Sequence, residues 1–372
     1  MEIKTLELKN FRNYSELFLK FNKSKILIIG KNAQGKTNIL ESIYFLSNLK
    51  SVRTSNLTEL INFDFDKLQI NANIIKSETD IDLSYYYDRE KKREGRINGV
   101  KSTIKNFKSV LKTVLFSTND LLLLRGAPQD RRDWLDRAIS QIYPAYDERL
   151  SKYDKIRIQK NNLIKDYAKT GNLNNDLLEV FNEQLSVTGS NIIYIRKKYL
   201  KEIEKFAREK HRTISETEEL EIRYANSFWK ENEKIEDIED IQQKFKAELE
   251  TRKQEEIRRC QACIGPHRDD IVFYINKNEA VKFASQGQQR TVVLALKLSE
   301  LDLITQKTGE APILLLDDVL AELDDIRQNY LLKSINQNVQ TIITSVDTIL
   351  FEDEFLKDVE IYKVENGNIK PD

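Results

Sequence analysis

The chain has 372 residues, 40% of them hydrophobic, which is enough for a sizeable core and for two domains or one domain with a large insertion. Lysine plus arginine and aspartate plus glutamate each number 60, so no global positive charge indicates nucleic acid, and any DNA contact needs a local patch. No apolar run of membrane-spanning length and no signal-peptide core occur in the sequence, which argues against a membrane protein and predicts a cytoplasmic location.

The first 46 residues predict a strand, a turn, a second strand, a loop and a helix. IKTLELKNF alternates, ILII is short and apolar, and GKTNILESIYFLSNL has helical spacing. The loop between the second strand and the helix fits the phosphate-loop pattern G-x-x-x-x-G-K-[ST] in its proper setting. It consists of Gly30, Lys31, Asn32, Ala33, Gln34, Gly35, Lys36 and Thr37.

Such a loop binds a nucleoside triphosphate through successive backbone N–H groups and the N-terminus of the helix that follows. We expect Lys36 to contact the β- and γ-phosphates. Thr37 offers a hydroxyl to Mg²⁺, which prefers hard oxygen ligands. The expected cofactors are therefore ATP and Mg²⁺.

Residues 67–116 contain runs with the alternation of β-strands, namely LQINANI, IDLSYYY and TVLFS. Asn98-Gly99 is a favoured pair for a two-residue hairpin turn. An antiparallel sheet is therefore predicted for this stretch. Its segment 89–96, REKKREGR, is strongly basic, and is either a solvated hairpin tip or a local contact for DNA phosphates.

From about 129 to 262 the pattern becomes helical. A long amphipathic helix is predicted for 178–206, where mainly apolar residues recur at spacings of three and four: Leu178, Phe181, Leu185, Thr188, Ile192, Ile195, Tyr199, Ile203 and Phe206. Gly171-Asn172 and the polar stretch near 214–240 are predicted turns between long helices. The segment is expected to form an antiparallel helical arm, whose apolar stripe serves packing.

Cys260 and Cys263 are the two cysteines of the chain, and His267 follows them closely. Zinc normally takes four ligands, and the other histidine, His211, lies far away in sequence. Plain reduced thiols are therefore favoured over a metal site.

After about 264, strand patterns return in DIVFYI, PILLLDD and VQTIITSV, with a helix predicted near 288–304. Alternating strands and helices imply a parallel α/β core. Its leucine-rich strand ends in Asp317-Asp318, the pattern of a Walker B motif. We expect Asp317 to hold Mg²⁺ directly or through water, and Asp318 to polarise the attacking water.

The run from Ser285 to Arg290, SQGQQR, resembles the signature loop of ABC-type ATPases. One interpretation is a helix start capped by Ser285. The other is a second anion site, in which Ser285, Gly287 and Gln288 contact the γ-phosphate held by another subunit, so that ATP joins two copies of the chain. The two phosphate motifs and the D-loop-like run Ala321-Glu322-Leu323-Asp324 favour the second interpretation.

Two further positions differ from typical ABC-type ATPases. Ser345 stands where transporters usually place a switch histidine, so no imidazole is expected at the γ-phosphate. Asp318 is one methylene shorter than the glutamate that many of these enzymes carry. Slow hydrolysis, and hence a nucleotide switch more than a motor, is expected.

Motifs along nearly the whole chain resemble the RecF family, compact relatives of SMC and Rad50 ATPase heads. The runs that carry the resemblance, in family order, are LKNFRNY at 8–14, TNILE at 37–41, GAP at 126–128 with Arg131-Arg132 and Leu135-Asp136, GPHRDD at 265–270, ASQGQQRT at 284–291 and LALKL at 294–298. The run from Gly265 to Asp270 is the most specific of them, and its mechanical role does not follow from the sequence.

The resemblance implies an ATP-dependent, DNA-binding dimer with weak ATPase activity. Such proteins act in recombinational repair of gapped DNA, in replication restart and in the SOS response, and they work with RecR and RecO to load the RecA recombinase. They bind single- and double-stranded DNA without sequence preference. The likeness to the Rad50 head implies that Arg12 and Asn13, and also Arg53, lie near the nucleotide.

Three positions depart from the pattern of the RecF family. Ala33 stands where the family usually has glycine in the phosphate loop, which requires a negative φ if it is to be unstrained. Val52 replaces a histidine. Thr118-Asn119-Asp120 replaces Pro-Glu-Asp in the region of the Q-loop, so the Q-loop residue stays unassigned.

The predicted fold class is α/β, an ABC-type ATPase head with a mixed parallel core plus an antiparallel sheet and an inserted helical arm. The predicted domains are the N-terminal part of the head at 1–128, the arm at 129–262 and the C-terminal part of the head at 263–372. Three alternatives share the phosphate motifs: the nucleotide-binding subunit of an ABC transporter, an SMC or Rad50 head, and an inactive ATPase that serves as a scaffold.

Overall fold

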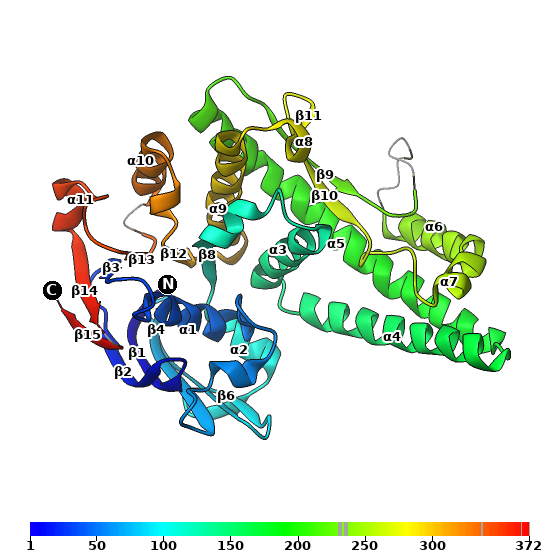
Figure 1. Ribbon diagram of the computed structural model, residues 1–372, viewed down its shortest axis with the longest axis horizontal. Coiled ribbons are helices and arrows are strands. Elements are labelled where there is room, and N and C mark those ends of the chain that lie inside the picture. The colour runs from blue at the N-terminus through cyan, green and yellow to red at the C-terminus, as the bar shows by residue number, and fades with distance from the viewer. Residues whose placement is uncertain (230–232, 234–236, 336–337, 366, 372) are drawn as a thin grey trace. The chain divides into compact units, whose positions relative to one another are not determined.

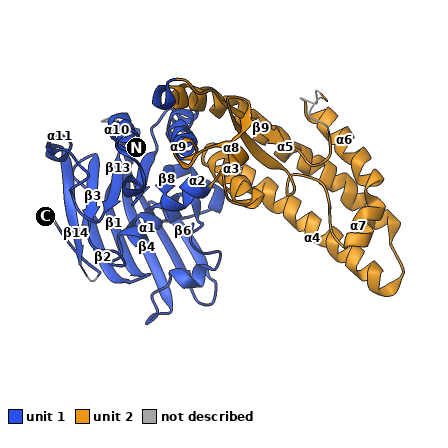
Figure 2. Ribbon diagram, turned by 45° about the horizontal axis from the view of Figure 1, so that its top comes forward, with its two compact units in different colours: residues 1–122, 213–216, 290–372 blue, residues 123–212, 217–289 orange. Residues whose placement is uncertain are grey.

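The computed structural model describes residues 1–229, 233, 237–335, 338–365 and 367–371. The chain forms two compact units, each assembled from separate stretches (Figure 2). Unit 1 contains residues 1–122, 213–216 and 290–372, and unit 2 contains residues 123–212 and 217–289. One unit is thus inserted into the sequence of the other, and residues 263–289, predicted as part of the head, belong to the inserted unit.

Unit 1 contains an antiparallel sheet in the order β2-β1-β4-β5-β6-β7 (Figure 1). Buried residues alternate mainly with half-buried ones along its long strands, as expected for a sheet with one face on the core. Asn98 and Gly99 have φ values of 50° and 77° in the turn between β6 and β7, which confirms the predicted hairpin. The strands are β1 (Glu2–Phe11), β2 (Tyr14–Lys20), β4 (Lys67–Lys76), β5 (Thr79–Asp88), β6 (Arg93–Ile97) and β7 (Val100–Ser102).

The second sheet of unit 1 has the order β15-β14-β3-β13-β12-β8 and is parallel except for β15. Its central strands β3, β12 and β13 are buried along most of their length because both faces of the sheet are covered. The strands are β3 (Lys25–Ile29), β8 (Thr113–Ser117), β12 (Ile313–Asp317), β13 (Thr341–Ser345), β14 (Val359–Glu365) and β15 (Asn368–Pro371).

Helix α1 (Lys36–Asn48) is buried along most of its length because it contacts strands of both sheets, β1 on one side and β8, β12 and β13 on the other. Its residues Ile39 and Ile43 are fully buried in one apolar cluster with both sheets. The remaining helices of unit 1 are α2 (Ile104–Val110), the larger part of α9 (Gln286–Thr308), α10 (Asp325–Ser334) and α11 (Asp353–Lys357), with short 3₁₀ turns at Leu57–Leu60, Thr118–Leu122 and Leu320–Glu322.

Unit 2 is dominated by helices. The predicted helix over 178–206 is the centre of the 41-residue α5 (Asn175–Ser215), and Gly171 ends α4 with a φ of 72° at the predicted turn. The other helices are α3 (Pro128–Ile142), α4 (Tyr146–Thr170), α6 (Ile238–Thr251), α7 (Lys253–Arg259) and α8 (Ala280–Phe283).

A small antiparallel sheet in unit 2 corrects two predictions. Its strands are β9 (Leu220–Ala225), β10 (Asp270–Ile275) and β11 (Asn278–Glu279), in the order β11-β10-β9. β9 lies within the stretch 214–240 that was predicted as a turn, whose residues 230–232 and 234–236 lie outside the described residues. β10 was predicted in the parallel core, but it pairs antiparallel with β9. Alternation predicts that a segment is a strand, but not which strand it pairs with.

The TVLFS strand is a third correction. It was predicted in the antiparallel sheet of 67–116, yet as β8 it pairs parallel with β12, with Leu115 opposite Leu315. The structure otherwise has the predicted α/β head, with a parallel core, an antiparallel sheet and a helical insertion. Across the described residues, no helix is long and apolar enough to cross a membrane.

Candidate nucleotide-binding site

The phosphate loop joins the end of β3 to the start of α1. Gly35 has a φ of 112°, and a Cβ there would lie 2.6 Å from both the Asn13 side-chain amide and the Tyr14 hydroxyl. A Cβ on Gly30 would lie 2.5 Å from the Val364 carbonyl oxygen. Both glycines are thus required by the close approach of other segments. No side chain in the described chain caps the N-terminus of α1, which leaves its amide groups to an anion.

Ala33 corrects the expectation of a negative φ in this loop. Its φ is 64°, in the left-handed region where an L-residue with a Cβ costs about 1–2 kcal/mol. Glycine adopts this conformation without that cost. The loop therefore keeps its shape around Ala33 at the expense of local strain.

Lys36 is almost completely buried, and its ammonium is held inside the loop. Its Nζ donates hydrogen bonds to the carbonyl oxygens of Gly30, at 2.8 Å, and Lys31, at 3.3 Å. The same atom lies 3.8 Å from Oδ2 of Asp318. The lysine of the first motif and a carboxylate of the second thus share one site.

Asp317 connects the two motifs directly. The Thr37 hydroxyl donates to Asp317 Oδ1 at 2.9 Å, and the Thr344 hydroxyl donates to the same oxygen at 3.0 Å. Burial raises the pKa of Asp317, the two hydroxyl donors lower it, and the charge of Asp318 raises it further. The Thr37 hydroxyl and the Asp317 carboxylate, 280 positions apart in sequence, are thus in direct contact, and both carry hard oxygen atoms of the kind that Mg²⁺ prefers.

Asp318 has an unusual backbone for a residue other than glycine, with a φ of 49°. Its N–H donates to the Thr344 hydroxyl at 2.9 Å. Its Oδ1 is buried and has no hydrogen-bond partner among the described residues. A strained residue with an unsatisfied buried oxygen is the kind of feature that occurs at functional sites. The oxygen ligands present therefore fit Mg²⁺, which favours carboxylate and hydroxyl groups.

Of the two neighbouring residues that the resemblance implies near the nucleotide, Asn13 contacts the phosphate loop and Arg12 contacts helix α1. The Asn13 side-chain amide donates to the Gln34 carbonyl oxygen at 3.2 Å, and its oxygen accepts from Asn38 Nδ2 at 2.7 Å. Arg12 instead makes a two-pronged contact with the buried carboxylate of Glu41, at 2.9 and 2.7 Å.

Arg53 also reaches this side of α1. Its guanidinium donates to the Asn38 side-chain oxygen at 2.7 Å and lies 3.6 Å from the Glu41 carboxylate. The Ser51 hydroxyl donates to Glu41 at 2.5 Å. Glu41 therefore binds both arginines. The sequence did not predict this role, because Glu41 stood out there only as part of the TNILE run that resembles the RecF family.

Two further positions singled out in the sequence, Ser345 and the Q-loop region, lie in unit 1. Gly30 N–H donates to the Ser345 carbonyl oxygen at 3.2 Å, so the end of β13 lies against the loop. In the Q-loop region, Asp120 accepts from the Ser117 N–H and hydroxyl at 2.8 Å and pairs with the buried Lys297 at 2.8 Å. Asp120 is thus occupied in tying β8 to α9.

Ser285 begins α9 with a reciprocal cap in unit 2. Its hydroxyl accepts from the Gln288 N–H at 3.2 Å, and its own N–H donates to Gln288 Oε1 at 2.8 Å. Gln288 Nε2 donates in turn to the Glu218 carboxylate at 2.6 Å. The structure thus shows the helix cap of the first interpretation, in which the Gln288 N–H is already bonded to Ser285. Gly287, next to the cap, lies in the first turn of α9.

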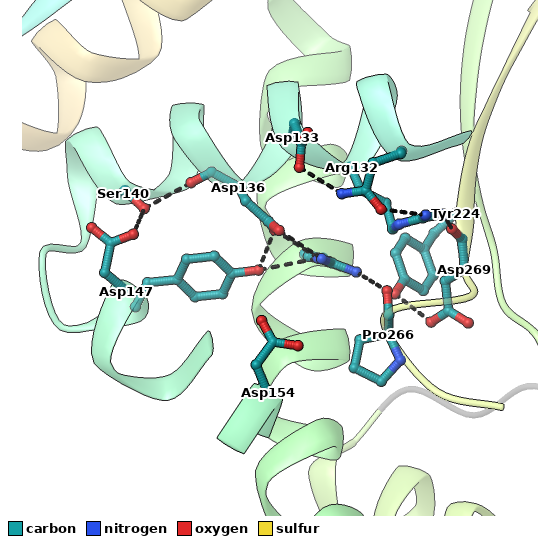
Figure 3. Close-up of polar contacts among 12 residues, drawn as sticks. Arg132, Asp133, Asp136, Ser140, Asp147, Asp154, Tyr224, Pro266 and Asp269 are labelled. Carbon is teal, nitrogen blue, oxygen red and sulfur yellow. Dashed lines mark hydrogen bonds and ion pairs between the residues drawn. The ribbon is translucent and has the colours of Figure 1, made fainter. Parts of the chain in front are cut away.

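The run from Gly265 to Asp270 is built into a buried polar network of unit 2 (Figure 3). Arg196 donates to the Pro266 carbonyl oxygen at 2.6 Å and pairs with Asp136 at 2.8 Å. Asp269 accepts from the Tyr224 hydroxyl and the Ser227 N–H. The run therefore connects α3, α5 and β9, and its role in the fold is to hold these elements together.

The thiols and His267 have individual neighbours in unit 2. His267 contacts the Tyr153 hydroxyl at 2.7 Å through Nδ1 and the Ala262 carbonyl oxygen at 3.2 Å through Nε2. Burial lowers the pKa of His267 to about 3, so it is neutral at physiological pH. Cys260 and Cys263 are free and partly exposed.

Comparison with known proteins shows the family to which the chain belongs. The RecF/RecN/SMC N terminal domain family matches residues 2–370. "DNA replication and repair protein RecF" of Bacillus velezensis is 38% identical over 99% of this chain and 100% of its own length, and the protein of that name from Oceanobacillus iheyensis is 40% identical over 99% of both chains.

Solved structures agree with the sequence relatives. A structure of the recombination mediator protein RecF with ATP, in the RecFOR pathway, has a TM-score of 0.91 and 33% identity, covering 99% of this chain and 97% of the other. An Smc head bound to the C-terminal winged-helix domain of ScpA has a TM-score of 0.56 at 15% identity and shows a shared fold alone.

Proposed function

Because the chain belongs to the RecF family of DNA replication and repair proteins, we propose that it is an ATP-controlled, DNA-binding dimer of recombinational repair. The observation that carries the proposal is the meeting of Thr37, Asp317 and Asp318 with Lys36 at the phosphate loop. Two distant motifs converge there on a site shaped for the phosphates of ATP.

ATP binding divides among the residues as follows. The backbone from Gly30 to Thr37 and the N-terminus of α1 hold the phosphates, and Lys36 neutralises the β- and γ-phosphates. Asn13 holds the loop through the Gln34 carbonyl oxygen, and Arg12 holds helix α1 through Glu41. Thr37 and Asp317 are the ligands for Mg²⁺. The ion, when bound, offsets the negative charge of the phosphate oxygens.

Hydrolysis is assigned to Asp318, with Lys36 stabilising the charge of the transferred phosphoryl group. The unsatisfied Oδ1 of Asp318 is an acceptor for the attacking water. Its side chain is shorter than glutamate and already lies 3.8 Å from Lys36, which supports weak hydrolysis and a switch role.

Dimerisation places the Ser285, Gly287 and Gln288 segment of one copy at the γ-phosphate of the other. The support is that these three residues lie together at the start of α9, where the reciprocal cap between Ser285 and Gln288 fixes their positions. ATP then stabilises the dimer, and hydrolysis releases it.

The biological setting follows the family. DNA contacts are to the sugar–phosphate backbone of single- and double-stranded DNA, without sequence preference. Mediator proteins of the RecR and RecO type are the protein partners, and the outcome is recombinase loading at gapped DNA, replication restart and SOS induction. The match to the RecF family over nearly the whole chain favours this function over that of a transporter subunit. The similarity to the Smc head, at 15% identity, supports a shared fold and not a shared function.

Sedimentation velocity of the wild type and Ser285→Arg, each with ATP-Mg²⁺ and with ADP, tests the proposal. The wild type is expected to dimerise with ATP alone, and the arginine is expected to abolish dimerisation because it occupies the γ-phosphate position at the helix N-terminus. Lys36→Arg is expected to remove the response by impairing ATP binding, since a planar guanidinium does not replace a compact ammonium. A wild type that stays monomeric with ATP contradicts the dimer.

A further inference from the structure

One face of helix α5, the long helix of unit 2 in Figure 1, carries a row of cations. The residues recur at spacings of three and four, which places them on one side of a helix. We call them the basic stripe: Lys198, Lys201, Lys205, Arg208 and Arg212. All five are exposed.

The stripe takes no part in holding unit 2 together. The opposite face of the same segment supplies the packing, with Tyr199, Ile203 and Ala207 fully or almost fully buried. Within the described part of the chain, none of the five cations makes a hydrogen bond or an ion pair. Glu202 and Glu209 lie along one edge of the row and have contacts of their own. Five cations thus remain available to an external anion.

The other basic segment of the chain has a different character. In the β5–β6 hairpin, Arg89 lies 3.4 Å from Asp66, and Lys92 pairs with Glu90 at 2.6 Å. Glu94 pairs with both Arg96 and Lys101. In the hairpin that the sequence suggested as a DNA contact, Arg89, Lys92 and Arg96 are thus paired with acids, whereas no cation of the stripe is paired within the described residues.

We propose that the basic stripe of α5 binds the sugar–phosphate backbone of DNA. At about 1.5 Å per residue, the row from Lys198 to Arg212 is about 21 Å long, which corresponds to roughly six base pairs of duplex at about 3.4 Å each. A straight row of five cations matches a line of phosphates. Protein interfaces, in contrast, are depleted in lysine at their cores and enriched in aromatic residues.

The proposal rests on the proposed function, since it assigns the surface through which a DNA-binding protein makes its contacts. The net charge of the chain is zero, so a local row of this kind is what any backbone contact requires. Backbone contacts carry no sequence information, which agrees with binding that lacks sequence preference.

The test is the salt dependence of binding to a random-sequence duplex of about 30 base pairs, measured by fluorescence anisotropy with the full chain and ATP-Mg²⁺. The variant is Lys201→Gln/Lys205→Gln/Arg208→Gln, and glutamine is both neutral and a good helix former. The matched control is Lys92→Gln/Arg93→Gln/Arg96→Gln in the hairpin, which removes the same charge.

The stripe variant is expected to bind about tenfold or more weakly at moderate salt, and its plot of log affinity against log salt is expected to be shallower by about 0.9 for each lost phosphate contact. ATP-driven dimerisation by sedimentation is expected to be unchanged. An unchanged slope in the stripe variant, or a larger loss in the hairpin control, overturns the inference. A wild type that shows no salt-dependent binding contradicts the proposed function itself.

Discussion

Individual residues of the phosphate site carry strain that the sequence did not reveal. The motif predicted which residues meet, and Lys36, Thr37, Asp317 and Asp318 do meet. Neither the positive φ of Asp318 nor the role of Thr344, which bonds both aspartates, follows from a motif. Both depend on how β12 and β13 pair, and a pairing of strands is a property of the fold.

Ala33→Gly is expected to stabilise the chain, because glycine relieves the left-handed backbone at φ 64°. The gain in free energy of unfolding is about 1 kcal/mol. Scanning calorimetry of both proteins measures it. Ala168→Gly, at an exposed helical position of α4, is the matched control and is expected to lose about 1 kcal/mol. An equal loss in both variants would contradict the strain at Ala33.

At the scale of elements, the run from Gly265 to Asp270 locks β10 to its neighbours through a buried carboxylate. Burial raises the pKa of Asp269 to about 6, while the hydrogen bonds from Tyr224 and Ser227 lower it in part. Folded chains therefore keep a proton on Asp269 between pH 3.8, the ordinary value, and about pH 6, whereas unfolded chains release it. The contribution of Asp269 to stability consequently falls as the pH rises through this window.

Asp269→Asn removes that titration. The free energy of unfolding of the variant relative to the wild type is expected to increase from pH 4 to pH 6, by roughly 1–3 kcal/mol, and to level off above. Urea unfolding followed by tryptophan fluorescence measures this free energy. The signal reports on unit 2, which contains Asp269, because Trp134 and Trp229 both belong to that unit. Asp166→Asn, an exposed carboxylate of α4, is the control for the loss of a carboxylate. Parallel curves for wild type and Asp269→Asn would show that the carboxyl group is not titrating in this window.

The sequence predicted most helices and strands but not how the strands pair. Periodicity located β8 and β10 as strands but assigned them to the wrong sheets, because alternation reports burial and not the partner strand. β9 was missed, since its six residues follow a polar, acidic stretch that reads as a turn. The helix over 178–206 was predicted well because its apolar stripe is long and regular.

At the scale of the whole molecule, the fold class and the family followed from a few motifs in a characteristic order, since those motifs are tied to a head with one topology. The central claim is that each ATP site needs two copies of the chain. Each copy then supplies one half of two different sites. The phosphate loop and the Walker B motif of unit 1 form one half, and the Ser285 segment of unit 2 forms the other.

Mixing two inactive variants tests this claim most directly. Lys36→Arg lacks a working phosphate loop and keeps its Ser285 segment, while Ser285→Arg has the reverse defect, so a mixed pair contains one complete site. Sedimentation with ATP-Mg²⁺ is predicted to show each variant alone as a monomer and the mixture as a dimer that forms at higher concentration than the wild type. A mixture that stays monomeric, while the wild type dimerises under the same conditions, would contradict a site shared between two subunits.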